Sequence, residues 1–369
     1  HLIFVVKIKN NMRVCIIGAG LSSITLAKAL VNQKIHVDLV AKKKDFLHNH
    51  TRTIGISKSN VEYFNKHIIN VNKIIWKINE IEIFSENLKN EKILNFKDDK
   101  SQLFSIIKNF QLDKVITNSL SKSKFFQKKN INRKTILSDK YNLVINTDYF
   151  DEITKKFFYK KITKKYNSFA YTTIIKHKKI KNDIATQIFT SKGPIAFLPV
   201  SNYETSVVFS IQNSKNENDI NIKNLISKYN LKYKIIKINK IHSFELKSLN
   251  LRSYYYNNIL AFGDLLHRIH PLAGQGFNMT IRDIKILIDI IKRKNNLGLP
   301  LDKSINSEFE NNSKHKNLIF SNGIDFIYQF FDTERKFNNS FLSKTVQIFG
   351  KNKPINKLFT KIADKGINF

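Results

Sequence analysis

The chain has 369 residues, of which 42% are hydrophobic, so it can bury a substantial core and does not belong to the disordered class. Its formal net charge of +34 comes from 63 Lys and Arg residues against 29 Asp and Glu residues. Cys15 is the single cysteine, which excludes an intrachain disulfide and a paired-cysteine metal or redox site. No apolar run reaches the roughly 20 residues that a membrane-spanning helix needs.

The positive charge has three possible explanations. Heavy use of Lys, Asn, Ile, Phe and Tyr is typical of an AT-rich coding sequence, which requires no partner. The alternatives are attraction to anionic lipid headgroups and binding of nucleic acid. Because the lysines are spread along the chain without a nucleic-acid motif, we expect no nucleic-acid partner. The leading residues 1–10 are too short for a signal peptide, and Met12 could be the natural start.

The first predicted unit is a strand over residues 14–17, a glycine-containing loop and a helix over residues 24–31. This order is typical of a dinucleotide-binding βαβ unit. Gly18 would permit the tight turn, and Gly20 would let a pyrophosphate approach the helix amino terminus, where the helix dipole favours negative charge. Ser23 stands in place of the third glycine and is small enough for the helix to pack on the strand.

The second strand of this unit, predicted over residues 37–40, lacks the acidic residue that normally follows it and holds the ribose. Ala41 and Lys42 stand at that point, while Asp38 lies inside the strand and is a poor substitute. We therefore expect the ribose to be held weakly or by another residue.

The middle of the chain predicts paired strands over residues 81–84 and 93–96, followed by a helix over residues 102–110. A strand over residues 143–145 then returns to the cofactor unit and ends near Asp148. Beyond residue 171 a mostly antiparallel sheet is expected from four strands, over residues 172–175, 187–190, 195–198 and 206–211.

The most informative stretch covers residues 263–283. Asp264 directly follows a buried apolar run, and Gly274 and Gly276 would let the backbone come close to a ligand. The apolar spacing over residues 281–291 then predicts a helix that packs on the sheet. A strand, an acid, a glycine-rich loop and a helix amino terminus make a site for a phosphate-bearing cofactor, whereas a plain connection would explain only one glycine.

His267 and His270 have a spacing that suits a metal or acid–base pair on one helical face. Pro271 disfavours helical geometry at His270, and Asp264 is the one evident carboxylate partner. We therefore expect no metal site. His267 would support the loop, and His270 with Pro271 would lie beside the cofactor.

Together these motifs resemble the FAD-dependent aromatic-ring hydroxylases of the para-hydroxybenzoate hydroxylase type, and within them the ubiquinone-biosynthesis hydroxylases. The resemblance covers most of the chain from Met12 onward. It implies that Gly18, Gly20 and Ser23 hold the pyrophosphate of FAD and that Asp264 binds its ribitol. The other cofactor contacts that it implies are Arg52, Gln102, Gly274, Gln275, Gly276 and Asn278. It also implies that residues 193–200 cross the substrate domain above the flavin, and that His270 and Pro271 position the reactants without a covalent nucleophile.

The resembled family also carries an Asp-Gly pair that serves both FAD and the nicotinamide donor. Asp148 stands at the position of the acid, but Tyr149 replaces the glycine. A tyrosine does not adopt a positive φ without strain, so we expect a changed backbone at this point.

The implied fold class is α/β, with a discontinuous Rossmann-like FAD-binding domain, an inserted and mostly antiparallel β-sheet substrate domain, and a helical C-terminal region. The expected domain limits are 12–60, 100–150 and 255–295 for FAD binding, 61–99 and 151–254 for the substrate, and 296–369 for the C-terminal region.

In the C-terminal region four apolar residues recur at helical spacing and share one face: Phe320, Ile324, Ile327 and Phe331. Core packing is one explanation of this face. The alternative is a membrane-facing or substrate-entry surface beside Arg335 and Lys336.

The function implied by the resemblance is an FAD-dependent monooxygenase that uses NADH or NADPH and O2 to hydroxylate the ring of a (poly)prenylated phenol in ubiquinone biosynthesis. Because this substrate is mostly hydrocarbon, we expect a cytoplasmic protein that contacts the inner face of the membrane peripherally or joins a quinone-biosynthesis complex. Two alternatives stay open. One is a flavin-binding relative that has lost hydroxylation and serves as a scaffold, and the other is a basic membrane- or nucleic-acid-binding protein with a vestigial cofactor fold.

Overall fold

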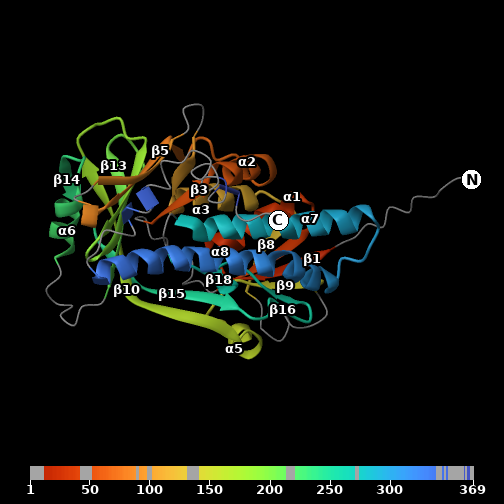
Figure 1. Ribbon diagram of the computed structural model, residues 1–369. Coiled ribbons are helices and arrows are strands. Elements are labelled where there is room, and N and C mark those ends of the chain that lie inside the picture. Colours follow the sequence, from red (N-terminus) through yellow and green to blue (C-terminus); the bar gives the residue numbers. More distant parts are fainter. Residues whose placement is uncertain are drawn as a thin grey trace, which may run out of the picture.

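The computed structural model contains three sheets and the helices that cover them (Figure 1). The residues that it describes are 12–41, 52–88, 91–97, 102–130, 141–212, 221–270, 274–337, 343–344, 346–347, 361 and 364–365. Lys42 and Pro271 lie outside these ranges, and the side chains of Arg335 and Lys336 are likewise not described. None of the helices in the described ranges is long and apolar enough to cross a membrane.

The first sheet has the strand order β16–β17–β9–β1–β2–β8. Its strands are β1 (Arg13–Ile17), β2 (His36–Val40), β8 (Phe126–Lys129), β9 (Leu143–Asn146), β16 (Tyr255–Tyr256) and β17 (Ile259–Ala261). All neighbours are parallel except β16 and β17. Because β1, β9 and β17 are parallel neighbours, their carboxyl ends meet at one edge although they are far apart in sequence.

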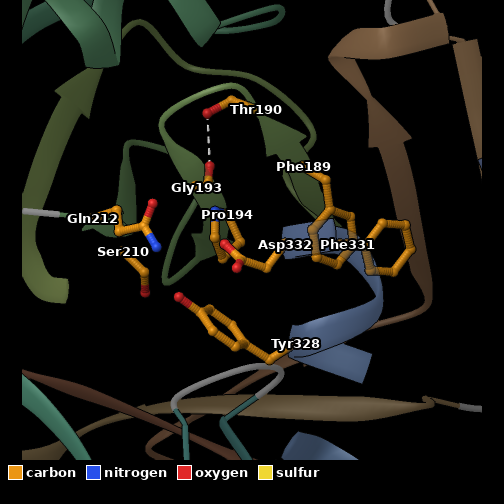
Figure 2. Close-up of a pocket in the computed structure, with 9 residues that line it drawn as sticks. All are labelled: Phe189, Thr190, Gly193, Pro194, Ser210, Gln212, Tyr328, Phe331 and Asp332. Carbon is orange, nitrogen blue, oxygen red and sulfur yellow. Dashed lines mark hydrogen bonds between the residues drawn. The ribbon is translucent and has the colours of Figure 1, made fainter. Parts of the chain in front are cut away.

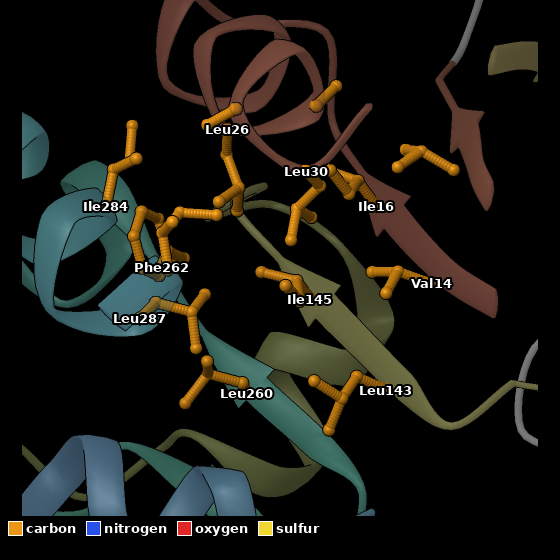
Figure 3. Close-up of a cluster of buried hydrophobic side chains, with 14 of the residues drawn as sticks. Val14, Ile16, Leu26, Leu30, Leu143, Ile145, Leu260, Phe262, Ile284 and Leu287 are labelled. Atoms are coloured by element: carbon orange, nitrogen blue, oxygen red, sulfur yellow. The ribbon is translucent and has the colours of Figure 1, made fainter. Parts of the chain in front are cut away.

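The core of this region lies between the first sheet and the helices α1 (Leu21–Asn32), α3 (Asn109–Leu120) and α7 (Gln275–Asn296). Figure 3 shows Leu26 and Leu30 of α1 and Leu287 of α7 pointing toward the side chains of the parallel strands. Each fully buried Leu or Ile contributes roughly 1.5–3 kcal/mol relative to an exposed one. The apolar runs that predicted strands and helices from the sequence are therefore the same residues that hold the layers together.

A small antiparallel sheet has the order β3–β7–β4 and is formed by β3 (Thr53–Ser57), β4 (Ile75–Ile78) and β7 (Phe104–Lys108). The helix predicted over residues 102–110 is therefore wrong. Residues 104–108 form the central strand, because the β-branched pair Ile106 and Ile107 can bury one side chain on each face. The helix α3 begins only at Asn109.

The second large sheet has the order β18–β15–β10–β13–β12–β11–β5–β6, with β14 paired to β10. Its strands are β5 (Glu80–Ser85), β6 (Glu91–Lys97), β10 (Lys161–His177), β11 (Ile184–Thr190), β12 (Gly193–Pro199), β13 (Glu204–Gln212), β14 (Ile235–Ile238), β15 (His242–Leu251) and β18 (His267–Arg268). Only the β11–β5 pair is parallel. The four strands predicted beyond residue 171 fall within β10 to β13, and the predicted fold class is confirmed.

The remaining elements are the helices α2 (Lys58–His67), α5 (Glu152–Phe157), α6 (Ile222–Tyr229) and α8 (Ser304–Phe337), and the short turns η2 (Glu86–Leu88) and η4 (Gly263–Leu265). The domain limits stay a prediction. Val61 and Phe64 of α2, which we assigned to the substrate domain, pack in the core of the first sheet.

The long helix α8 runs beside α7 (Figure 1). On the face predicted from helical spacing, Phe320 and Ile324 are buried, and the ring of Phe331 stacks on Phe189 with centroids 3.6 Å apart. Ile327 is 44% exposed and lies at the edge of that face. Core packing is therefore the correct explanation for three of the four residues.

Candidate cofactor site

The loop after β1 requires glycine at its first position. Gly18 has a φ of +118°, and a Cβ there would lie 2.3 Å from Oγ1 of Thr147, which follows β9. Thr147 Oγ1 donates a hydrogen bond of 2.9 Å to the carbonyl of Ile17 and lies 2.7 Å from Oγ of Ser23. Ser23, which we predicted as a packing position, therefore ties the start of α1 to two parallel strands.

Gly20 leaves the amino terminus of α1 open. It is the N-cap residue, its φ of −69° is ordinary, and no side chain caps the helix. A Cβ at Gly20 would meet no atom within 4 Å. The unpaired N–H groups and the helix dipole of α1 thus face open space at the carboxyl edge of the sheet, which is where an anionic pyrophosphate fits.

Asp264 follows β17 at the same edge and is exposed within η4. The preceding Gly263 has a φ of +65°, and a Cβ there would come within 2.8 Å of the Cβ of Ser22 in α1. This close approach brings the η4 turn against the start of α1. Asp264 therefore lies, exposed, in a turn that packs against the start of α1.

The loop into α7 provides a second helix amino terminus without a side-chain cap. Gly274 has a φ of +62° and packs against the backbone of Gly55 in β3, and a Cβ at Gly276 would meet open space. Gln275 is buried, and its Oε1 has no hydrogen-bond partner in the structure. Oε1 of Gln102, two residues before β7, is also buried and has no hydrogen-bond partner among the described residues.

The two unpaired amide oxygens show whether the site fits FAD, the cofactor that the sequence implies. A buried amide oxygen without a donor costs free energy, so native proteins rarely keep one unless a water or ligand satisfies it. A heterocycle that carries N–H groups, such as the flavin ring of FAD, supplies donors of this kind. The two open helix termini and the two amide oxygens therefore fit FAD.

Asn278 is buried and uses its side chain inside the protein. Its Nδ2 donates to the carbonyls of Gly55 at 3.0 Å and Gly274 at 3.2 Å. Its Oδ1 accepts from the backbone N–H of Ser57 at 2.9 Å and from Nδ2 of Asn60 at 2.8 Å. These four hydrogen bonds hold the loop against β3, and the predicted contact of Asn278 with the cofactor stays a prediction.

Arg52 lies on the other side of the same region, directly before β3. It is exposed, and its guanidinium carbon lies 6.0 Å from the ring centroid of Phe244 in β15. Oγ1 of the adjacent Thr53 donates a 2.7 Å hydrogen bond to Oγ of Ser206 in β13. The side chain of Arg52 is thus placed at the seam between the small sheet and the second large sheet.

Asp38 does not replace the missing ribose acid. It is buried in β2 and accepts hydrogen bonds from Oη of Tyr141 at 2.7 Å and from Nζ of Lys129 at 2.6 Å. Arg13 lies 3.8 Å away. This carboxylate neutralises cations within the sheet edge and is not available to a ligand, as the sequence led us to expect.

Tyr149 follows β9 and does not have a positive φ, so its backbone conformation is one that a tyrosine adopts without strain. Its Oη lies 2.7 Å from Nζ of Lys161, which donates to it, and the guanidinium carbon of Arg268 lies 5.4 Å from its ring centroid. The carboxylate of Asp148 accepts from the backbone N–H of Phe150 at 2.8 Å. This corner is therefore packed against two cationic side chains.

His267 has a carboxylate partner that sequence reasoning missed. Its Nε2 lies 2.5 Å from Oδ2 of Asp283, whose Oδ1 accepts from Nδ2 of Asn317 at 2.9 Å. The side chains of His267 and Asp283 are 1% exposed. This buried network joins β18, α7 and α8. The signal was present in the sequence, since Asp283 falls on the apolar stripe of α7 beside Ile284.

His270 lies in an aromatic cluster next to the cofactor loop. Its ring stacks on Tyr328 with centroids 4.3 Å apart and meets Tyr166 edge-on at 5.0 Å. Oη of Tyr166 in turn hydrogen-bonds Asp325 of α8. Both ring nitrogens of His270 are buried without a partner, and burial lowers the pKa of His270 to about 3. The imidazole is therefore neutral near physiological pH and is not a cationic acid.

The low pKa of His270 makes a prediction for stability. In the unfolded chain His270 is protonated below about pH 6.5, whereas in the folded chain it is protonated only below about pH 3. Unfolding therefore binds a proton between these values, and the folded state loses stability as the pH falls from 6.5, by up to about 1.4 kcal/mol per pH unit. Urea unfolding at several pH values measures how steeply the free energy of unfolding falls with falling pH. We expect this fall to be less steep in His270→Gln than in the unmodified protein. His315→Gln, which removes an exposed histidine, serves as the control, and an unchanged slope in His270→Gln would contradict the assignment.

A pocket lies between the second large sheet and α8, next to this cluster (Figure 2). It is lined by Phe189, Thr190, Gly193, Pro194, Ser210, Gln212, Tyr328, Phe331 and Asp332. Its cavity of about 20 Å³ has room for one water-sized molecule. Because Tyr328 both lines the pocket and stacks on His270, this cavity borders the aromatic cluster, and its lining includes Gly193 and Pro194 at the start of the predicted strand over residues 193–200.

A family model described as an FAD binding domain matches residues 161–293, which include Asp264, Gly274 and Asn278. The chain is 29% identical over 155 residues to 3-demethoxyubiquinol 3-hydroxylase of Escherichia coli, covering 40% of this chain and 39% of that protein. It is 31% identical over 114 residues to a mitochondrial ubiquinone biosynthesis monooxygenase of Dictyostelium discoideum, covering 31% of this chain and 22% of that protein. The chain thus aligns with two fifths or less of the length of these relatives.

Two solved structures show the same fold over nearly the whole chain. One is p-nitrophenol 4-monooxygenase from Pseudomonas putida, with a TM-score of 0.75, 11% identity, and coverage of 96% of this chain and 100% of that chain. The other is Klebsiella pneumoniae HpxO complexed with FAD and uric acid, with a TM-score of 0.75, 12% identity, and coverage of 96% and 98%. The resemblance found in the sequence is therefore confirmed at the level of the fold: the chain has the same fold as these two proteins, and residues 161–293 match a family model described as an FAD binding domain.

Proposed function

We propose that this protein is an FAD-dependent monooxygenase that hydroxylates the ring of a (poly)prenylated phenol in ubiquinone biosynthesis, with NADH or NADPH as reductant. The observation that carries the proposal is the convergence of three parallel strand ends and two uncapped helix amino termini around one exposed carboxylate, Asp264. This arrangement supplies anion-binding N–H groups beside an acceptor for hydroxyl groups.

In this proposal each part of the site has one task. Gly20 and the start of α1 bind the pyrophosphate, Asp264 accepts hydrogen bonds from the ribitol, and Gln275 accepts one from the flavin ring. Bound FAD would supply the activation of O2 and the transfer of one oxygen atom. The protein must exclude water from the reacting atoms. The neutral ring of His270 and its aromatic neighbours are suited to forming such a dry wall, and Pro271 would complete the positioning of the reactants.

The names of the relatives support the choice of substrate. The Escherichia coli protein is named as a hydroxylase of demethoxyubiquinol, and the Dictyostelium protein as a monooxygenase of ubiquinone biosynthesis. A substrate of this kind has a polar ring and a long hydrocarbon chain. We therefore also propose a cytoplasmic location with peripheral contact to the inner face of a membrane or to a quinone-biosynthesis complex.

The role of Asp264 can be tested by Asp264→Ala. The variant should bind FAD about 10- to 100-fold more weakly, because hydrogen bonds to a charged acceptor contribute roughly 1.5–3 kcal/mol. Fluorescence titration of the apoprotein with FAD measures the dissociation constant. Asp289→Ala, which removes an exposed carboxylate elsewhere on α7, is the matched control. Equal affinities in Asp264→Ala and the unmodified protein would rule out the ribitol contact.

The reaction itself is tested with the FAD-loaded protein, NADH or NADPH, O2 and candidate prenylphenols. The proposal expects a product that carries one additional oxygen atom, identified by mass spectrometry. Nicotinamide consumption alone is not sufficient, because uncoupled oxidation also consumes it. A protein that gains no flavin absorbance on titration with FAD would contradict the proposal at its first step.

A flavin-binding scaffold without hydroxylase activity is the second candidate. Tyr149 favours it, because its ring and its hydrogen bond from Lys161 occupy the corner where the resembled family has a glycine. Anaerobic stopped-flow reduction separates the candidates. Bound FAD that neither NADH, NADPH nor a partner reductase reduces would favour the scaffold, whereas reduction followed by ring hydroxylation would exclude it.

A further inference from the structure

The helix α2 is capped by a residue from a distant part of the chain. Its N-cap residue is Ser57, whose side chain makes no capping hydrogen bond to the helix. Asp364 supplies the cap instead, because its Oδ1 accepts from the backbone N–H of Ser59 at 2.8 Å. Ser59 is the second residue of α2, and its N–H is one of the two that a capping side chain ordinarily engages. A carboxylate at this place also stabilises the positive end of the helix dipole.

The backbone of Asp364 binds the same turn. Oγ of Ser57 and Oγ of Ser59 each donate a hydrogen bond of 2.9 Å to the carbonyl oxygen of Asp364. Ser57 is buried, so water does not readily replace this acceptor for its hydroxyl. With the bond to the N–H of Ser59, three hydrogen bonds join this one residue to the junction of β3 and α2.

The junction of β3 and α2 also holds the cofactor loop. The backbone N–H of Ser57 donates to Oδ1 of Asn278 at 2.9 Å, and Nδ2 of Asn60 donates to the same oxygen at 2.8 Å. Nδ2 of Asn278 in turn donates to the carbonyl of Gly274 at 3.2 Å. The start of α2 therefore binds the loop into α7 and Asp364 at the same time, and Ser57 takes part in both contacts.

Arg282 links Asp364 electrostatically to α7, the helix that follows the cofactor loop. Nη1 and Nη2 of Arg282 are buried without a hydrogen-bond partner among the described residues, and the guanidinium carbon lies 4.4 Å from the ring centroid of Phe320. Burial lowers the pKa of Arg282 to about 10, and the carboxylates of Asp283 and Asp364 oppose this fall. Asp283 is already paired with His267. Of these two carboxylates, that of Asp364 is therefore the one left to balance the buried guanidinium.

We propose that Asp364 is a positioning residue for the cofactor loop. It caps α2 and binds the hydroxyls of Ser57 and Ser59, and it thereby fixes the junction that holds Asn278 and the loop into α7. Asp364 acts through these residues and does not itself contact the cofactor. It lies outside residues 161–293, which match the family model. The inference rests on the proposed binding of FAD at this loop.

The proposal is tested on the full chain by titration with FAD and by the visible circular dichroism of the bound flavin. In Asp364→Ala the dissociation constant for FAD should rise about tenfold, because the loop is no longer held in its binding geometry. The circular dichroism of the flavin should lose intensity, because a loosely held ring has no fixed orientation. Asp364→Asn keeps an oxygen that can accept from the N–H of Ser59 but loses the charge beside Arg282. Its affinity for FAD should lie between those of Asp364→Ala and the unmodified protein.

The matched control removes a helix cap that is not connected to the cofactor loop. Oδ1 of Asn221 caps α6 by accepting from the backbone N–H of Asn224 at 3.1 Å, and α6 packs in the core of the second large sheet. Asn221→Ala and Asp364→Ala should both lower the free energy of unfolding, because each helix loses its cap. Only Asp364→Ala should change the affinity for FAD and the circular dichroism of the flavin. Equal changes in the two variants, or no change in Asp364→Ala, would overturn the proposal.

Hydrogen exchange of the apoprotein supplies a measurement that needs no FAD. Backbone amides of residues 53–60 and 275–281 should exchange several-fold faster in Asp364→Ala than in the unmodified protein, and at unchanged rates in Asn221→Ala. If the exchange responds in this way but the unmodified protein binds no FAD, the proposed function fails and the anchoring by Asp364 stands. If FAD binds and Asp364→Ala changes neither exchange nor affinity, the positioning role fails alone. Urea unfolding checks that each variant is folded, and Asp364→Asn carries the comparison if Asp364→Ala is not.

Discussion

Gly20→Asp should abolish FAD binding while it leaves the apoprotein folded and at least as stable as before. Gly20 is the N-cap of α1, its φ of −69° suits any residue, and no atom lies within 4 Å of a Cβ built there. Aspartate is among the best N-cap residues, and it gains a few tenths of a kcal/mol over glycine. Its carboxylate would accept the same N–H groups that the pyrophosphate needs and would repel the phosphate charges. We expect affinity for FAD to fall at least 100-fold, about 2.7 kcal/mol.

Two further substitutions at Gly20 separate charge from size. Gly20→Asn has nearly the same volume and capping ability without the charge, and Gly20→Ala adds only a methyl group. The loss of affinity, measured by FAD titration, should decrease in the order Asp, Asn, Ala. Thermal unfolding of the apoproteins checks that all three are folded. If Gly20→Asp bound FAD like the unmodified protein, the pyrophosphate would not lie at the start of α1.

Asp283→Ala should lower the free energy of unfolding by about 3 kcal/mol. The carboxylate pairs with His267 and Asn317, and its side chain is 1% exposed. Its removal leaves a buried imidazole and a buried amide without partners, and breaking a buried pair of this kind typically costs roughly 3–5 kcal/mol. Urea unfolding of the apoprotein measures the change. The substitution should also destabilise the cofactor loop, because His267 lies between Asp264 and His270 in the sequence.

A double-mutant cycle isolates the contact between Asp283 and His267. Asp283→Ala and His267→Ala should each lower the free energy of unfolding. The double variant should lower it by much less than the sum of the two, because it leaves neither partner buried without the other. Asp283→Asn keeps the size and one acceptor and should lose less than Asp283→Ala. Additive losses would show that the two side chains do not interact in solution and would contradict the network.

The two cofactor motifs could be found from the sequence because each is local. Gly18, Gly20 and Ser23 lie within six consecutive residues, and Asp264 to Gly276 follow one strand, so backbone requirements alone point to them. The prediction of FAD depended on recognising both motifs together. Neither motif shows by itself that the two lie at the same edge of the first sheet, because this depends on β1, β9 and β17 being parallel neighbours.

Residues 102–110 show where local reasoning fails. Their apolar residues fit a helix almost as well as a strand, and only the pairing of residues 104–108 with β3 and β4 decides between them. For Asn278 the position in a glycine-rich loop predicted a ligand contact, and the tertiary structure adds a role in holding the loop. Three hydrogen bonds with the distant residues Gly55, Ser57 and Asn60, and one with Gly274, fix its side chain inside the protein.

Four features could be predicted from the amino-acid sequence alone: the α/β class, the glycine turn at Gly18, the acid at position 264 and the resemblance that implies FAD. These follow from backbone geometry and from periodicity, which act over a few neighbouring residues. Two features follow from the tertiary fold and not from the sequence: Asp283 is the partner of His267, and burial keeps His270 neutral. Each of these depends on which surfaces meet when water is excluded, and contacts between segments far apart in the chain leave no short-range pattern.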